Sequence, residues 1–122
     1  MKRLVAFFEI PCVDFKRAIA FYESVFNVKL DAYDCGEEKM AFFSEGESGT
    51  CGAISWAKDF RPSKDGVLVS LCCEDMVKTI ESIEKSGGQI ITPRTRIEAD
   101  DRGYFSVFID CEGNRLGLWS EK

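Results

Sequence analysis

The sequence predicts an α+β fold of two tandem β-α-β-β-β units, whose strands form a cupped, half-barrel-like mixed sheet with the helices on its convex face. Two observations predict it. The second half of the chain repeats a pattern of the first half, and each half combines one segment of helical period with several segments of strand period. We therefore expect one domain over residues 1–122, built of repeat units 1–60 and 65–122.

The repeat is clearest in a helical segment that recurs after about half of the chain. A second match closes both halves, because Gly52-Ala53-Ile54 aligns with Gly117-Leu118-Trp119. A helix and a closing strand that match in the same order indicate a tandem repeat. The matched helical pairs are Asp14 with Asp75, Phe15 with Met76, Arg17 with Lys78, Ile19 with Ile80, Tyr22 with Ile83 and Glu23 with Glu84.

The first unit begins with an apolar segment over residues 4–10, which predicts a strand. Asp14 is a good N-cap for a helix over residues 15–26, because its side chain can accept hydrogen bonds from the free N–H groups of the first turn. Apolar residues at helical spacing then give this helix one apolar face. Further short strands are expected near residues 28–33, 39–43 and 50–56.

The second unit follows a polar connection over residues 58–66. Its helix is expected near residues 75–86, and Gly87-Gly88 is a usual signal for a helix C-terminus. The strands of this unit are expected near residues 67–73, 89–92, 104–109 and 115–120. On the apolar faces of the two helices we expect these residues to be buried: Phe15, Ile19, Tyr22, Met76, Ile80 and Ile83.

The composition limits the partners. A formal net charge of −5 argues against a general nucleic-acid or anionic membrane surface, because phosphate binding needs a basic patch. No segment approaches the ~20 apolar residues of a membrane-spanning helix. The six cysteines form no C-x-x-C motif, and their apolar neighbours favour buried free thiols over disulfides. We therefore expect a cytoplasmic protein that binds neither nucleic acid nor membrane.

The chain has no histidine. This absence excludes Ser-His and Cys-His nucleophile pairs, and it removes imidazole as a metal ligand or proton carrier. Ser70 and Cys72 therefore have no base partner of that kind, which disfavours a nucleophilic role for either residue.

Strand alternation places six candidate ligand-binding residues on one face of the expected sheet. The mixture of aromatic, apolar and a few polar side chains on that face is typical of a small-molecule cavity. A solvent-facing sheet is the alternative, but the large apolar side chains disfavour it. The six residues are Phe7, Glu9, Leu68, Ser70, Arg115 and Trp119.

Glu9 is the best catalytic candidate among them. A carboxylate in an apolar strand can orient an amine or a hydroxyl, or act as a general base where burial raises its pKa. Alternatively, Glu9 pairs with Arg115 or another cation, or reaches solvent at the rim. Two further alternatives stay open: Arg115 can clamp a carboxylate or remain solvated, and Trp119 can stack on a flat ligand or fill the cup.

Three fragments in order carry a family resemblance: Glu9-Ile10-Pro11-Cys12-Val13-Asp14, then Arg17-Ala18-Ile19-Ala20-Phe21-Tyr22-Glu23, then Asp110-Cys111-Glu112-Gly113-Asn114-Arg115-Leu116-Gly117-Leu118. Together they resemble, over the whole chain, the vicinal oxygen chelate group of glyoxalase, bleomycin-resistance and extradiol-dioxygenase proteins. The last fragment is similar to the D-P-x-G-N turn of that family, with Cys111 in place of proline. The resemblance implies the fold above, a small organic ligand and a homodimer.

Metal-using members of this family bind the ion through His, Gln or Glu side chains on the first and last strand of each unit. The resemblance places three of these positions at Phe7, Leu68 and Gly117, and the fourth near Gly52. Phenylalanine, leucine and glycine side chains cannot coordinate a divalent ion. We therefore expect no metal and no other cofactor.

Small-molecule binding without the usual catalytic metal is the function that these observations favour. The first alternative is a lyase, isomerase or dioxygenase-type enzyme of the same superfamily, either metal-free with Glu9 as base or with a metal held by other residues. The second alternative is an accessory module that senses an effector or binds a partner. The identity of the ligand stays open.

Overall fold

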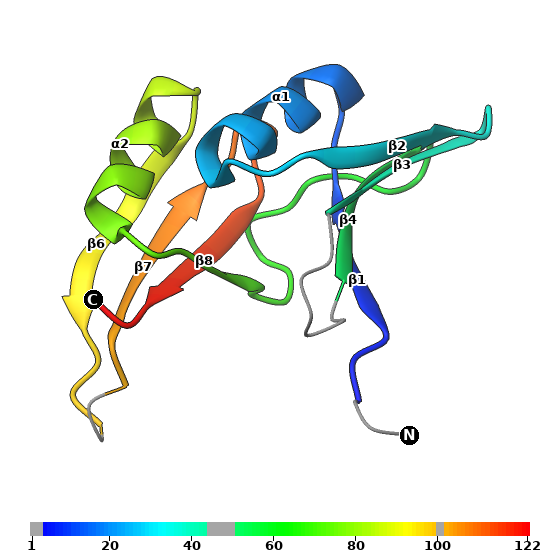
Figure 1. The fold of residues 1–122 in the computed structure, drawn as a ribbon. Helices are drawn as coiled ribbons and strands as arrows, with labels where there is room; N and C mark the ends of the chain where they lie inside the picture. The colour runs from blue at the N-terminus through cyan, green and yellow to red at the C-terminus, as the bar shows by residue number, and fades with distance from the viewer. Residues whose placement is uncertain (1–3, 44–50, 100–101) are drawn as a thin grey trace.

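A computed structural model of the chain describes residues 4–43, 51–99 and 102–122, with only the backbone of Cys51. Its two halves have the same order of elements, which confirms the predicted fold class (Figure 1). The first half contains β1 (Phe7–Pro11), α1 (Phe15–Phe26), β2 (Leu30–Asp34), β3 (Glu38–Phe43) and β4 (Cys51–Ala57). The second contains β5 (Ser70–Cys72), α2 (Met76–Lys85), β6 (Gln89–Arg96), β7 (Tyr104–Ile109) and β8 (Arg115–Ser120).

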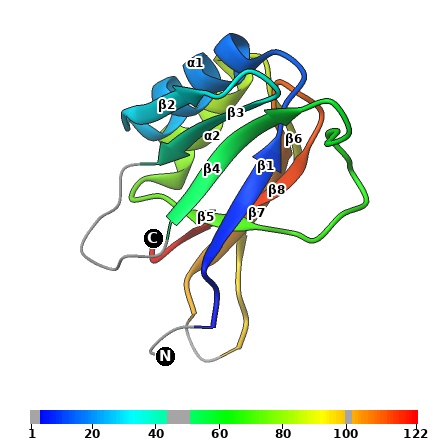
Figure 2. The same ribbon diagram turned by 90° about the vertical axis from the view of Figure 1, so that its right-hand side faces the viewer.

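Each half forms its own four-stranded sheet, with the orders β1-β4-β3-β2 and β5-β8-β7-β6. In both sheets the first strand pairs in parallel with the last, and the remaining pairs are antiparallel. The two helices lie on the same side of the molecule, above the sheets (Figures 1 and 2). This topology leaves β1 and β5 as edge strands, and both lie close to the junction between the halves.

The helix starts confirm the helical part of the internal alignment, whereas strand pairing matches Gly117 with Ala53 and not with Gly52. The side chain of Asp14 accepts a hydrogen bond from the backbone N–H of Arg17 at 3.0 Å, and that of Asp75 accepts one from Lys78 at 3.2 Å. Each aspartate thus satisfies an N–H group that the first helical turn leaves free. The end of α2 also follows the prediction, since Gly87 adopts a φ of +97°, which favours glycine.

The core lies between the helices and the two sheets. Tyr22, Met76 and Ile83 are buried as predicted, and Phe21 of α1 stacks on Phe108 of β7 with ring centroids 6.4 Å apart. The prediction was wrong for complete burial of three other helix residues. Phe15, Ile19 and Ile80 pack against the core but stay partly exposed, because the apolar stripe of each helix is wider than the surface that covers it.

Two edge strands are shorter at their start than predicted. β1 begins at Phe7, so Leu4 precedes it and is 90% exposed. β5 begins at Ser70, so Val67 precedes it and is 91% exposed. Pairing with β8 stops early because the backbone N–H of Arg115, the next donor along β8, bonds the carbonyl of Ser63 in the connection between the halves.

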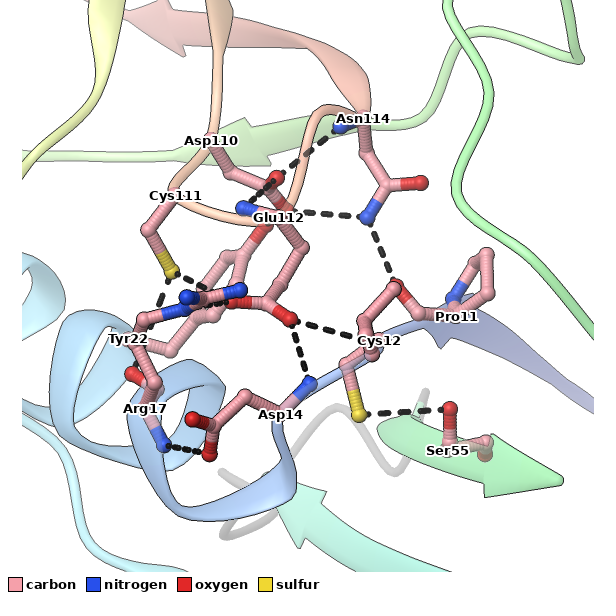
Figure 3. A network of polar contacts seen from close by, with 11 residues as sticks. Pro11, Cys12, Asp14, Arg17, Tyr22, Ser55, Asp110, Cys111, Glu112 and Asn114 are labelled. Atoms are coloured by element: carbon pink, nitrogen blue, oxygen red, sulfur yellow. Dashed lines mark hydrogen bonds and ion pairs between the residues drawn. The ribbon is translucent and has the colours of Figure 1, made fainter.

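The turn after β7 fastens the second half to the first (Figure 3). Asp110 accepts the hydroxyl hydrogen of Tyr22 at 2.6 Å, and Asn114 Nδ2 donates to the carbonyl of Pro11 at 2.7 Å. Asn114 Nδ2 also donates to Asp110 Oδ2 at 3.0 Å, so the two contacts form one network. Buried polar groups at the junction are thereby paired, as burial requires.

Glu112 of the same turn binds the start of α1. Its Oε1 accepts the backbone N–H groups of Val13 and Asp14, both at 2.8 Å, and its Oε2 accepts Arg17 Nε at 2.5 Å. The Glu112 side chain is only 1% exposed. Burial acts to raise the pKa of this carboxyl, but the hydrogen bonds from Arg17, Asp14 and Val13 outweigh it and lower the pKa below its ordinary value.

Candidate functional site

Glu9 lies in the middle of β1, and its side chain points away from the helix-packed face. Ser55 of β4 fixes it there, because Ser55 Oγ donates to Glu9 Oε1 at 2.9 Å. The register of the parallel pair places Glu9 beside Ala53, two residues before Ser55. The carboxylate is thus directed along β4, and Glu9 lines two neighbouring cavities.

The first cavity lies on the open face of the first sheet. It has a volume of about 410 Å³ and contains Phe7 and Glu9, as alternation along β1 predicts. Glu38 and Met40 of β3 form its opposite side, and Phe60 of the connection closes one end. Apolar walls with a few carboxylates are typical of a small-molecule site.

The second cavity lies between β1 and the second half of the chain. Its volume is about 330 Å³, and it contains Glu9 together with Arg115 and Arg61. Two candidates from different halves of the chain, Glu9 and Arg115, therefore line the same cavity. In the part of the chain that the structure describes, the two do not form an ion pair, since the ion pairs there join Arg17 to Glu112 and Lys39 to Asp34.

The remaining candidates lie elsewhere. Trp119 lines a third cavity near the end of α1, and its indole Nε1 donates to the carbonyl of Arg102 at 2.7 Å. Leu68 precedes β5 and is 49% exposed. Ser70 starts β5, where it pairs with Gly117 of β8. The structure therefore places Glu9 with Phe7 in one cavity and with Arg115 in the other, whereas Trp119 lines neither.

The positions at which the resemblance places metal ligands lack donor atoms. Phe7 and Leu68 have hydrocarbon side chains. Gly117 has no side chain, and the Ser70 hydroxyl occupies the space that a Cβ at residue 117 would need. The placement near Gly52 was wrong, because Gly52 pairs with Phe8 and a side chain there would meet the Phe8 ring on the helix-packed face, away from Phe7. Within the described ranges, no three His, Cys, Asp or Glu side chains gather as a metal-binding group would. The residues at these positions do not fit the metal.

The sequence analysis missed several residues of the cavities, among them Ser55, Glu38 and Phe60. Ser55 and Glu38 become neighbours of the site through the pairing of β3 with β4, which places Glu38 beside Ala57 and Met40 beside Ser55. Alternation within one strand cannot give that register. Phe60 belongs to the connection and reaches the site by an irregular bridge to Ala57.

Solved structures with the same fold include three proteins of known source. Glyoxalase I from Zea mays has a TM-score of 0.76 and 18% identity, over 95% of this chain and 45% of its own. The fosfomycin resistance protein FosX from Listeria monocytogenes has a TM-score of 0.72 and 17% identity, over 98% and 91%. A superfamily member from Sphaerobacter thermophilus has a TM-score of 0.74 and 16% identity, over 97% of both chains.

These identities show the fold alone. The chain spans a little under half the length of the maize enzyme. A search of curated proteins gives no match. No helix among the described residues is long and apolar enough to cross a membrane.

A family model, however, matches residues 4–118. The chain therefore belongs to the Glyoxalase/Bleomycin resistance protein/Dioxygenase superfamily.

Proposed function

We propose that this protein binds a small organic molecule at Glu9, without a metal, as a homodimer in the cytoplasm. The observation that carries the proposal is the place of Glu9, where a carboxylate held by Ser55 borders two cavities. Neighbours of the same fold include FosX, one structure of which is a complex with Mn(II) and 1S,2S-dihydroxypropylphosphonic acid. Phe7, Leu68 and Gly117 have no side-chain atoms that could coordinate a metal, which supports a ligand that is held by the protein alone.

Fragment binding followed by amide NMR shifts tests this site. We expect fragments to perturb the amides of Phe7, Glu9 and Ser55, and Glu9→Gln to weaken those that carry a hydrogen-bond donor. Glu37→Gln is the matched control, because Glu37 is an exposed carboxylate outside both cavities. Perturbations that avoid these amides, or equal effects of the two variants, would contradict the proposal. Trp119→Ala tests the third cavity, which residues of both halves line.

Exposed apolar side chains at the start of the edge strands β1 and β5 support the homodimer. Val5 and Phe7 at β1 are 53% and 47% exposed, and Val67 and Leu68 before β5 are 91% and 49% exposed. Edge strands with apolar side chains associate with further chains unless they are covered. A second copy of this chain would cover both edges and enclose the cavities from outside.

Analytical ultracentrifugation tests the dimer. We expect Val67→Asp to shift the protein toward monomer, because the charge would be buried in the interface. Val77→Asp is the control, since Val77 is 55% exposed on α2, away from both edges. A wild-type protein that sediments as a monomer would exclude the homodimer. Equal dissociation of the two variants would exclude the edge at Val67 as its interface.

The enzymatic alternative has one observation in its favour. Glu9 Oε1 accepts a hydrogen bond from Ser55, and Glu9 is an exposed residue that lines the cavity, so the carboxylate is oriented and accessible for proton transfer. An enzyme of this kind would lose turnover in Glu9→Gln yet still bind its substrate. A ligand-binding protein would lose affinity instead, so the separate measurement of binding and turnover distinguishes the two functions.

The cytoplasmic location rests on the thiols. Five cysteines with described side chains are free, and the exposed Cys35 and Cys72 are among them. Exposed free thiols persist in a reducing compartment. A fluorescent fusion that stained the cell envelope or the medium would contradict this location.

A further inference from the structure

The first cavity is a trough with a floor of small side chains. Strand β4 runs along its centre, and Ser55 and Ala57 form the floor between β1 and β3. Because neighbouring strands lie ~4.8 Å apart, the backbones of β1 and β3 are about 10 Å apart across this floor. That width admits a flat organic group between the two walls.

Each wall of the trough carries one carboxylate. Glu9 stands on β1 beside Ala53, and Glu38 stands on β3 beside Ala57. The two therefore occupy diagonal corners of the trough, and the hydrogen bond from Ser55 draws the Glu9 carboxylate toward its centre. Both negative charges border the same space, so they raise the concentration of cations there.

Neither carboxylate is neutralised within the described residues. Lys39 also borders the cavity, but its Nζ is turned away from both carboxylates: it lies 5.2 Å from the ring centroid of Trp56 and 4.0 Å from Asp34. Strand alternation explains this, since Lys39 follows Glu38 and must point the opposite way. The trough is therefore acidic, in a protein whose formal net charge is −5.

Aromatic and thioether side chains complete the trough. Phe7 is 47% exposed and Phe60 is 37% exposed. Both residues border the cavity, and so does Met40. The face of an aromatic ring attracts a cation, and the attraction adds to that of a nearby carboxylate. Phenylalanine rings also bury the apolar body of a ligand.

We propose that the ligand of this trough is an organic cation with a flat apolar body, such as an aryl amine or amidine, bound in the space that Glu9, Glu38 and the ring of Phe7 border. The proposal rests on the proposed small-molecule site and adds the charge of its ligand. Arg61 and Arg115 border the neighbouring cavity only, so they leave the acidic trough to the cation.

Three probes of similar shape and different charge test the inference: benzylammonium, benzyl alcohol and phenylacetate. Amide NMR titration measures the affinity of each at the amides of Phe7, Ser55 and Ala57. We expect benzylammonium to bind about tenfold more tightly than benzyl alcohol, a preference of ~1.4 kcal/mol, and phenylacetate to bind least. Added salt should reduce the preference, because exposed charges are screened.

Variants assign the preference to the two carboxylates. Glu9→Gln and Glu38→Gln should each reduce the preference for benzylammonium, and the double variant should abolish it. Glu37→Gln removes one equal charge from the turn before β3 and should leave the preference unchanged. An equal effect of Glu37→Gln and Glu38→Gln would overturn the proposal, since general attraction to an acidic protein would then suffice.

The outcomes separate this inference from the proposed function. If benzyl alcohol or phenylacetate binds at these amides as tightly as benzylammonium, the small-molecule site stands and the cationic ligand is excluded. If none of the three probes perturbs the trough, both proposals fail. If benzylammonium binds with the expected preference but at other amides, the trough is not its site and the inference is overturned.

Discussion

The hydroxyl of Tyr22 in α1 donates a 2.6 Å hydrogen bond to Asp110 Oδ2, so a helix of the first half binds the turn after β7 in the second half. Both residues are buried, with 0% and 3% of their surface exposed. Burial and the neighbouring Asp110 raise the pKa of Tyr22 well above its ordinary value, which keeps the hydroxyl protonated and able to donate. The bond links the two halves at the centre of the molecule.

Tyr22→Phe should destabilise the protein by about 1.5–3 kcal/mol, the range for a hydrogen bond to a charged group. Asp110 would keep its bonds from Asn114 and the backbone of the turn, so the fold should survive. Urea unfolding at neutral pH measures the change. Tyr33→Phe is the matched control, because Tyr33 is 58% exposed, and equal stability of the two variants would contradict the role of Tyr22.

Glu112 should make stability fall in acid. Its pKa is lowered in the folded state, so the ionised carboxylate stabilises the fold above the unfolded-state pKa, and this contribution is lost as pH falls through the lower folded-state value. The charged groups around it are Arg17, Asp14 and Asp110, with the thiol of Cys111. Glu112→Gln should therefore cost about 1–2 kcal/mol at pH 7 and progressively less toward pH 3.

Urea unfolding of wild type and Glu112→Gln across this pH range checks the prediction. Glu121→Gln serves as a control, because Glu121 is exposed beyond β8. A difference between wild type and Glu112→Gln that stayed constant down to pH 3 would mean that the charge of Glu112 contributes nothing.

The cysteines should differ sharply in reactivity. Burial raises the pKa of Cys12 to about 12 and also raises that of Cys111, so few thiolates form at either residue at neutral pH. Cys35 and Cys72 are exposed and should react first with a thiol reagent, followed residue by residue through peptide mapping. If Cys12 were labelled as fast as Cys35 in the folded protein, the Cys12 side chain would not be buried as the structure places it.

Ser70 and Gly117 should prove to be coupled across the β5–β8 pair. The Ser70 hydroxyl fills the space that a Cβ at residue 117 would need, so Gly117→Ala should destabilise by about 1–3 kcal/mol. Ser70→Ala removes the hydroxyl and leaves its Cβ 3.3 Å from the new methyl group, so the double variant should recover part of the loss. Additive effects in urea unfolding would exclude this coupling.

The sequence predicted the elements well where the signal is local. The bounds of α1 follow from Asp14 and from the apolar spacing that ends at Phe26, and the repeat then located α2 from Asp75. Strands β7 and β8 were predicted with their observed bounds, because both are apolar runs next to the turn at Asp110. Local capping and periodicity suffice for such elements.

Contacts between distant residues could not be predicted in the same way. Strand alternation put Glu9 on the face of Phe7, but the meeting of Glu9 with Glu38 depends on the register of three strands. The same limit affects Trp119, which shares a face with Arg115 in β8 yet lines a different cavity. A period of two gives the face of a residue, whereas its position across the sheet requires the pairing.

We expect the protein to bind no divalent transition metal tightly. Phe7 and Leu68 offer no lone pair, Gly117 offers no side chain, and the Ser70 hydroxyl covers the space above Gly117. Protein stripped of metal by a chelator should therefore melt at the same temperature with or without Ni²⁺, Zn²⁺ or Mn²⁺, since a ligand raises the melting temperature only where it binds the native state. Elemental analysis of protein purified without chelator should agree. A rise of several degrees that Glu9→Gln abolishes would refute the prediction, because it would place a metal on the carboxylate that we assign to an organic ligand.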